Sequence, residues 1–341
     1  MFKRILWLIF VLLIGYGASV LVRAVHMLEF RNARILSENI EDPDRFYYFT
    51  FDHSPKKESV FLDSNNVFVK DYSKAAMLGV RSAKFHNPIT ITHQTMRTWQ
   101  RYLQNQQADQ FNIFISNANW LVQEQTEKGA WLEHHTVKKG RGRTPEIWYS
   151  AYAQGLGMSV LTRAFIATGD STYLFTAIAA APPLAVRVED GGVLMDRNGS
   201  YSFEEYPMGK HSPGVLNGHI YALLGLYDVA NYTEDPLIDS LITIGEQFVR
   251  KNMDFYNADY WSYYCSLEDR KLSNHYHLCS PWYQNLHVVQ FNALNAITGN
   301  LEYKEMADNF EEQFNSPIRF GFNVAYVAYT DIVVLIRKSG Y

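Results

Sequence analysis

Residues 145–168, PEIWYSAYAQGLGMSVLTRAFIAT, decide the fold that we expect for this chain. Pro145 is a favourable residue at a helix start, so the stretch predicts a long helix over 146–168. Gly155 and Gly157 lie inside this helix. They lack the third glycine and the preceding strand of a dinucleotide-binding loop, so we interpret them as positions where another helix packs closely.

Helical patterns continue on both sides of this stretch. The other expected helices are His93–Asn105, Phe111–Gln125, Ser171–Ala181, Val215–Asn231, Pro236–Lys251, Trp282–Thr298 and Leu301–Phe314. Their modest loops favour consecutive helix pairs, with β-like inserts at 191–194 and 201–203. Because strands do not alternate with helices, a doubly wound sheet is disfavoured. We expect a mainly α fold, an α/α toroid-like incomplete barrel, with a plain helical array as the alternative.

The N-terminal residues carry a separate signal. Residues 5–22 are uncharged and strongly apolar, and they follow Lys3 and Arg4. This pattern predicts a transmembrane helix with a cytoplasmic N-terminus, which would place the rest of the chain in a lumen, a periplasm or outside the cell. A cleaved signal peptide is the alternative.

The next segment predicts a small β-structure. Two short apolar runs, 59–62 and 67–69, are separated by Ser-Asn-Asn at 64–66, which is typical of a β-hairpin. We therefore divide the chain into a transmembrane signal anchor (1–25), a stem with the hairpin (26–86) and a helical catalytic domain (87–341).

Composition excludes several protein classes. With 47% hydrophobic and 19% charged residues among 341, the chain is not disordered. Its formal net charge of -4 provides no field that recruits nucleic acid. Two cysteines, Cys265 and Cys279, are too few for a Cys-rich zinc site, and their spacing leaves a disulfide open. The 15% aromatic content favours surfaces that stack on a ligand.

Three segments combine aromatic and polar residues in a way that is unusual for a core. They are Phe203-Glu204-Glu205-Tyr206-Pro207, Trp261-Ser262-Tyr263-Tyr264 and Ser280-Pro281-Trp282-Tyr283-Gln284-Asn285-Leu286-His287. The alternative interpretations are a capped loop and an aromatic helix start that only packs. Tyr283 and His287 are four residues apart and share a helical face.

A basic run follows the first expected helix pair. Lys138, Lys139, Arg141 and Arg143 lie within six residues. Such a run is either a solvated loop or, in a chain of negative net charge, a local binding strip for a polyanion.

In four stretches the chain resembles the C-terminal catalytic region of the D-glucuronyl C5-epimerases. They are Trp148-Tyr149-Ser150-Ala151-Tyr152-Ala153-Gln154-Gly155, Phe203-Glu204-Glu205-Tyr206-Pro207, Val215-Leu216-Asn217-Gly218 with Tyr221 and Gly225-Leu226-Tyr227-Asp228, and Tyr283-x-x-x-His287-x-x-Gln290. This family converts glucuronate to iduronate in heparan-type chains. The pieces occur in the family's order between Asn87 and Phe314. The resemblance implies a toroid-like helical domain, a homodimer, a single-pass N-terminal anchor and a Golgi lumenal site. Its implied partner is an acidic, heparosan-like polysaccharide.

The resemblance also implies roles for individual residues. Glu205 and Tyr283 would handle protons on opposite faces of the sugar, and Tyr206 and Tyr264 would lie close to the reacting carbon. Asn217 would hold the substrate. Tyr263 competes with its neighbour for the second tyrosine position.

Further residues would bind substrate: Tyr149, Gln154, His287, Arg270, Lys138, Arg141 and Arg143. Arg270 enters because the family's Tyr-Asp-Leu-Arg motif is Tyr264-Cys265-Ser266-Leu267 here, which removes the clamping arginine from its register.

The chemistry explains why such residues are needed. C5 of a uronate lies next to the carboxylate, so removal of its proton creates a dianionic enolate that donors and cations must stabilise. A carboxylate and a tyrosine serve as the two proton carriers only if the site brings their pKa values together. No cofactor is required, although a structural calcium ion is possible. The alternatives are a uronate-specific polysaccharide lyase, a glycoside hydrolase and an inactive glycan-binding protein.

Overall fold

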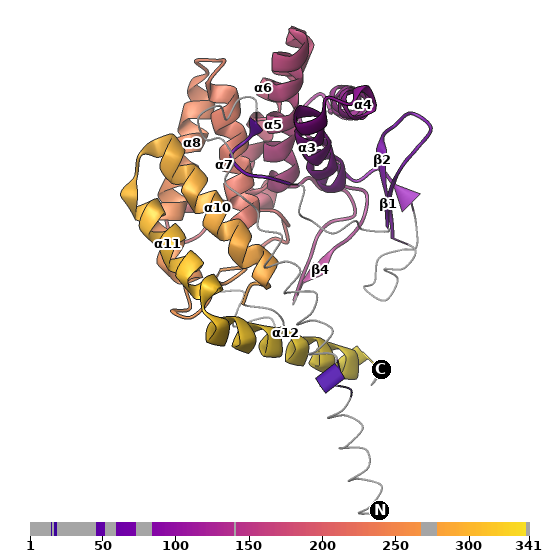
Figure 1. The fold of residues 1–341 in the computed structure, drawn as a ribbon. Coiled ribbons are helices and arrows are strands. Elements are labelled where there is room, and N and C mark those ends of the chain that lie inside the picture. Colours follow the sequence, from indigo (N-terminus) through magenta and orange to yellow (C-terminus); the bar gives the residue numbers. More distant parts are fainter. Residues whose placement is uncertain are drawn as a thin grey trace, which may run out of the picture. The chain divides into compact units, whose positions relative to one another are not determined.

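A computed structural model gives the fold (Figure 1). It describes residues 15, 17–18, 46–51, 59–72, 84–139, 141–266 and 278–338. These residues separate into two compact units, which are considered one at a time. The larger unit contains the described residues between 46 and 256 together with 265–266. The smaller unit contains 257–264 and 278–338. Both units are mainly helical, as the sequence predicts.

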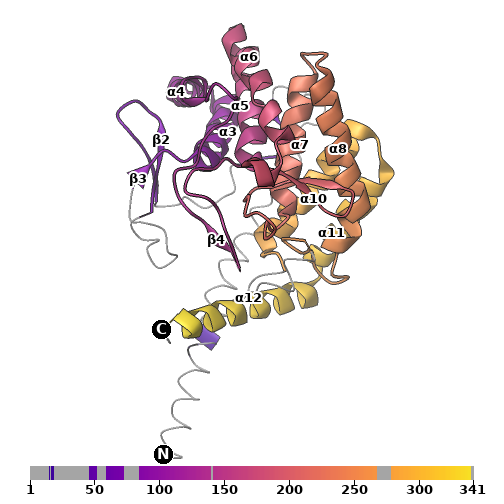
Figure 2. The ribbon, with the colours of Figure 1, turned by 180° about the vertical axis from the view of Figure 1, so that it is seen from behind.

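The larger unit consists of pairs of helices. Its helices are α3 (Pro88–Asn105), α4 (Ala108–Glu124), α5 (Ala151–Thr168), α6 (Ser171–Ala179), α7 (Leu216–Ala230) and α8 (Pro236–Asn252). Each helix packs against the next one in its pair, and α5 also packs against α3 and α7 (Figure 1). Figure 2 shows the same arrangement from behind. Since α5 and α7 are buried along almost their whole length, they form the centre of this unit.

The centre of the unit depends on glycine. A Cβ atom at Gly155 would lie 2.3 Å from the carbonyl oxygen of Tyr221, and one at Gly225 would lie 2.1 Å from the carbonyl oxygen of Gly155. Helices α5 and α7 therefore meet backbone to backbone. A Cβ at Gly157 would lie 2.5 Å from the Trp131 ring. The interpretation as a helix-packing residue is confirmed for Gly155, whereas Gly157 leaves room for a tryptophan in the connection after α4.

A buried ion pair joins the same two helices. Arg163 Nη1 and Nη2 lie 2.5 and 3.1 Å from Asp228 Oδ2 and Oδ1, and both side chains are fully buried. The Tyr48 hydroxyl donates to Asp228 Oδ1 at 2.9 Å. The aromatic segment Tyr47–Phe51 is thus fixed inside the helical unit and buried along its length.

The expected β-hairpin is present. Strand β1 (Val60–Leu62) pairs antiparallel with β2 (Phe68–Asp71), and β2 continues to β3 (Lys84–Phe85). Asp63 Oδ1 accepts hydrogen bonds from the Asn65 and Val67 amides and so closes the turn. Asn66 adopts a φ of 62°, which asparagine tolerates better than most residues.

Two further hairpins connect the helices. Strands β4 (Lys138–Lys139) and β5 (Gly142–Arg143) precede α5, and strands β6 (Leu194–Asp196) and β7 (Tyr201–Phe203) precede α7. The second hairpin confirms the β-like inserts. Short 3-10 helices cover Pro182–Ala185, Val188–Asp190 and Met253–Tyr256.

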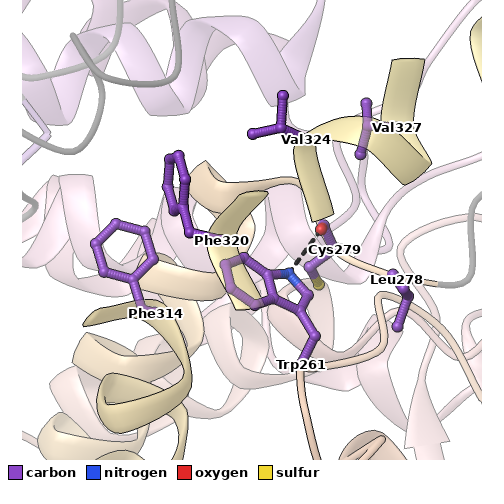
Figure 3. Close-up of a cluster of buried hydrophobic side chains, with 7 residues drawn as sticks. All are labelled: Trp261, Leu278, Cys279, Phe314, Phe320, Val324 and Val327. Carbon is purple, nitrogen blue, oxygen red and sulfur yellow. Dashed lines mark hydrogen bonds between the residues drawn. The ribbon is translucent and has the colours of Figure 1, made fainter. Parts of the chain in front are cut away.

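The smaller unit packs around an aromatic core. Its helices are α10 (Pro281–Thr298), α11 (Leu301–Asn315) and α12 (Pro317–Lys338). Figure 3 shows the core cluster of Trp261, Leu278, Cys279, Phe314, Phe320, Val324 and Val327. The Trp261 indole donates to the Cys279 carbonyl oxygen at 2.8 Å (Figure 3).

The fold prediction needs correction in one main respect. Among the described residues, no helix combines the length and apolar character needed to cross a membrane. This finding contradicts the N-terminal transmembrane helix in the predicted fold class, whereas the mainly helical part of that class is confirmed. Residues 5–22 and the stem at 26–46 lie almost entirely outside the described residues. Cys265 and Cys279 are buried thiols.

Two helix boundaries also differ from the prediction. Helix α5 begins at Ala151 rather than at 146, because Trp148 pairs with the backbone of Glu133 and the Ala151 amide donates to the Glu204 carbonyl oxygen at 3.1 Å. Helix α12 is missing from the prediction. Its buried residues Phe320, Val324 and Val327 recur every three or four positions, so the sequence does carry a helical pattern there.

Gly155→Ala tests the close packing of α5 and α7. We expect a loss of about 1–3 kcal/mol in the free energy of unfolding, because the new methyl group meets backbone that cannot move aside cheaply. Gly321→Ala in α12 is the matched control, since nothing lies within 4 Å of its Cβ position. The control should be neutral or more stable by up to about 1 kcal/mol. Urea unfolding measures both, and equal effects would contradict this account.

Candidate functional site

Two adjacent carboxylates between β7 and α7 have different surroundings. Glu204 is fully buried and its Oε1 lies 2.7 Å from Arg197 Nη2 and 2.5 Å from the Ser202 hydroxyl. Its Oε2 accepts from the Gly214 amide at 2.9 Å. Both oxygens of Glu204 are therefore engaged in holding the loop that leads into α7.

Glu205 is also buried, with 5% of its surface exposed, but its Oε2 has no hydrogen-bond partner among the described residues. Burial raises the pKa of Glu205, and the nearby Glu204 raises it further. Lys139 and hydrogen bonds from Tyr206 and Asn217 act in the opposite direction. The result is a carboxyl group with a raised pKa and an uncommitted oxygen, which is the form that a general base or acid takes.

Helix α7 begins directly against Glu205. A Cβ atom at Gly218 would lie 2.7 Å from Glu205 Cβ and 2.8 Å from its Oε2, so only glycine leaves room for the carboxyl group. Asn217 precedes this glycine in the first turn of α7 and hydrogen-bonds to Glu205. Asn217 thus supplies a hydrogen-bond partner for Glu205, and Gly218 leaves the space that its carboxyl group occupies.

Lys139 and Tyr206 complete the surroundings of Glu205. The Lys139 ammonium lies 3.9 Å from the centre of the Tyr206 ring, within the range of a cation–π contact. The Tyr206 ring also lies 5.9 Å from the Trp148 ring. The structure therefore brings three of the predicted site residues, Glu205, Tyr206 and Asn217, together with Lys139, and their roles stay predictions. Sequence reasoning missed Lys139 because it treated the basic run as one strip.

The basic run is a hairpin with two differently exposed parts. Lys138 pairs with Arg143 across β4 and β5, and Lys138, Arg141 and Arg143 are exposed. Lys139 is half-buried, in agreement with the alternation of side chains along a strand. The three exposed cations keep their predicted role as a strip for a polyanion. Arg270 lies outside the described residues.

Two predicted substrate-binding residues are engaged in the packing of the larger unit. The Tyr149 hydroxyl donates to the Pro183 carbonyl oxygen at 3.0 Å, and burial raises its pKa to about 12. Gln154 is fully buried, donates to the carbonyl oxygens of Gly129 and Ala180, and accepts from the Trp131 amide. These contacts leave both residues outside the group around Glu205, and their binding role stays a prediction.

The smaller unit contains the predicted tyrosines. The rings of Tyr264 and Tyr283 meet edge to face with centres 4.8 Å apart. The segment that carries Tyr264 is held by α10, because Gln284 Oε1 accepts from the Ser262 amide at 2.7 Å. The resemblance brought attention to both tyrosines, but not to Gln284, whose amide has no recognisable signal in the sequence.

His287 occupies the interior of the smaller unit. It is fully buried, and burial lowers its pKa to about 3, so the ring is neutral at physiological pH. Its Nδ1 lies 3.0 Å from the Ser262 hydroxyl, while its Nε2 has no partner among the described residues. The predicted substrate contact would have to use Nε2. Elsewhere, no group of three or more His, Cys, Asp or Glu in the described part of the chain is arranged to hold a metal ion.

Known proteins resemble this chain in the region that contains Glu205. A family model described as the D-glucuronyl C5-epimerase C-terminus matches residues 124–312. A D-glucuronyl C5-epimerase of Caenorhabditis elegans is 40% identical over 123 residues, which are 35% of this chain and 20% of that protein. An uncharacterised protein of Methanocaldococcus jannaschii is 34% identical over 169 residues, which are 48% of this chain and 52% of that protein. The chain thus spans about half or less of the length of these relatives.

The two adjacent carboxylates should respond oppositely to the same substitution. Glu204→Gln should lower the free energy of unfolding by about 3–5 kcal/mol, because it leaves Arg197 buried without its countercharge. Glu205→Gln should leave stability near neutral pH unchanged or increased, because it removes a carboxylate whose ionisation burial opposes.

The pH dependence follows from the raised pKa of Glu205. Ionisation weakens the folded state above the unfolded value near 4.5, so the advantage of Glu205→Gln should shrink as pH falls toward that value. Urea unfolding of the wild type and of Glu205→Gln at several pH values measures this difference in the free energy of unfolding. A destabilisation of Glu205→Gln as large as that of Glu204→Gln would contradict the assignment.

Proposed function

Because this chain belongs to the D-glucuronyl C5-epimerase family, we propose that it converts D-glucuronate to L-iduronate residues in a heparosan-like polysaccharide. The observation that carries the proposal is the contrast between Glu204 and Glu205. One carboxylate is fully paired, and the next has a raised pKa and an oxygen available for a proton. Both lie in the region that matches the family.

The reaction moves one proton away from C5 and returns another. A carboxylate takes the C5 proton, and the electron pair of the broken C–H bond delocalises onto the uronate carboxylate as an enolate. A second acid donates a proton to the opposite face of C5, which forms the new C–H bond and inverts the centre. The glycosidic bonds stay intact, and no electrons are gained or lost.

Glu205 is suited to one of these roles. Its raised pKa makes its carboxylate a stronger base than an exposed glutamate, while Lys139 and two hydrogen bonds favour its ionised form. Tyr206 and Asn217 are within hydrogen-bonding reach of the same carboxyl group. The proposal assigns them the role of orienting it.

The second proton carrier in the proposal is Tyr283. This assignment comes from the family resemblance. A tyrosine hydroxyl is an acid strong enough to protonate an enolate, and its ring has Tyr264 at its edge. Within the smaller unit, Tyr264 is therefore the direct aromatic neighbour of the proposed proton donor.

Incubation of the full chain with heparosan in deuterated water tests the proposal. NMR should show deuterium at C5 of the uronate residues and the appearance of iduronate, with no shortening of the polysaccharide. Glu205→Gln and Tyr283→Phe should each reduce the exchange rate by about 10²–10⁴-fold, because each removes a proton carrier. Glu189→Gln and Tyr260→Phe, at exposed positions, are the matched controls and should keep full activity.

The other possible results identify the alternatives. An unsaturated, ultraviolet-absorbing product would show that the chain is a lyase, in which the C4 oxygen leaves after the same proton abstraction. Binding of heparosan without exchange by the folded wild-type chain would show an inactive glycan-binding protein. Either result would overturn the proposal.

The pH profile gives an independent test. If the ionised form of Glu205 takes the proton, the exchange rate should rise with pH through a pKa above the ordinary value of 4.5. Exchange rates measured at constant ionic strength over a range of pH give this pKa. A pKa at or below 4.5 would argue against Glu205 as the base.

A further inference from the structure

We propose that Lys139 provides the positive charge that neutralises the substrate carboxylate and the enolate formed from it. This inference rests on the proposed epimerase function and gives it a group that the conversion requires. The enolate carries two negative charges near one carbon atom, and its formation needs a cation fixed in place before the proton leaves.

Lys139 is placed beside the proton carrier. Its ammonium lies 3.9 Å from the centre of the Tyr206 ring, and Tyr206 hydrogen-bonds to Glu205. Lys139 is also the strongest of the influences that favour the ionised form of Glu205. A uronate whose C5 approaches Glu205 therefore brings its own carboxylate close to Lys139, since that carboxylate is attached to C5.

The other cation near these carboxylates is already used. Arg197 binds Glu204 Oε1 at 2.7 Å and donates to the Ser212 carbonyl oxygen at 2.7 Å. It also donates to the Ser202 and Ser266 hydroxyls at 2.8 and 3.1 Å. These contacts surround the guanidinium group, so Arg197 serves to hold the loop. Among the groups that act on Glu205, Lys139 is the cation.

The hairpin holds Lys139 on the side that faces Tyr206. A Cβ atom at Gly142 would lie 2.7 Å from Met208 Sδ and 2.9 Å from the His211 carbonyl oxygen, so β5 packs directly on the loop that follows Tyr206. Behind the strands, the Thr144 amide donates to the Val137 carbonyl oxygen at 3.0 Å. A fixed charge lowers the barrier more than a mobile one does, because the site needs little reorganisation when the enolate forms.

Charge balance explains why a lysine is useful here. A bound uronate would add a second carboxylate near Glu205, and like charges would raise the pKa of both groups. The buried Glu204 adds to this repulsion. Lys139 offsets it, so that Glu205 can remain ionised while the substrate carboxylate is bound. The same ammonium then attracts the charge that moves onto that carboxylate as the C5 proton leaves.

Lysine substitutions test the inference by C5 exchange. Lys139→Met should reduce kcat by about 10²–10³-fold, because it removes a charge that acts in the transition state. Lys139→Arg should recover part of the loss. Lys138→Met, on the exposed neighbour, should mainly raise KM, and Lys128→Met, at an exposed position near α4, should change neither parameter. An unchanged kcat in Lys139→Met would overturn the inference.

A second measurement does not depend on activity. Glutamate residues labelled with 13C at the carboxyl carbon allow NMR titration of Glu205, whose signal is the one absent in Glu205→Gln. Lys139→Met should raise the pKa of Glu205, and Lys138→Met should shift it much less. A pKa unchanged in Lys139→Met would overturn the inference. If the wild-type chain shows no C5 exchange, the proposed function fails, and this titration still decides whether Lys139 and Glu205 interact.

Discussion

The buried ion pair between Arg197 and Glu204 is the interaction on which the candidate site depends. It joins the β6–β7 hairpin to the loop before α7, because Arg197 contacts Ser202 on one side and Ser212 and Ser266 on the other. Both carboxylate oxygens of Glu204 are taken up by these contacts, whereas Glu205 lies beside Gly218 at the start of α7. The ion pair thus fixes the loop that carries Glu205, and it leaves Glu205 buried without an ion pair of this kind.

Much of the helical fold was predictable from the sequence, because packing periodicity is a local property. Gly155 indicated close helix packing, and the Ser-Asn-Asn turn that ends at Asn66 predicted a hairpin. The start of α5 was not predictable, since Trp148 forms a backbone bridge with Glu133. Such a boundary depends on a partner that is distant in the chain. Helix α12 is different, because Phe320, Val324 and Val327 recur at helical spacing and make this helix readable from the sequence.

The candidate site shows the same division. Family resemblance selected Glu205 rather than Glu204, but it gave no physical reason why the two adjacent carboxylates differ. That distinction comes from Arg197, which is seven residues before Glu204 and carries no motif. Likewise, the basic run at 138–143 has one composition but two faces, and only the hairpin register separates Lys139 from its exposed neighbours.

The aromatic segment Tyr47–Phe51 has a practical consequence for anyone who shortens this chain to obtain it without its apolar N-terminal residues. Tyr48 supplies a hydroxyl to Asp228, and the Tyr47 ring lies 4.8 Å from the Arg163 guanidinium. A recombinant form that starts at residue 52 or later would leave a cavity beside Arg163 and Asp228 and would let water reach the interface of α5 and α7. A form that starts before Phe46 keeps the aromatic segment in place.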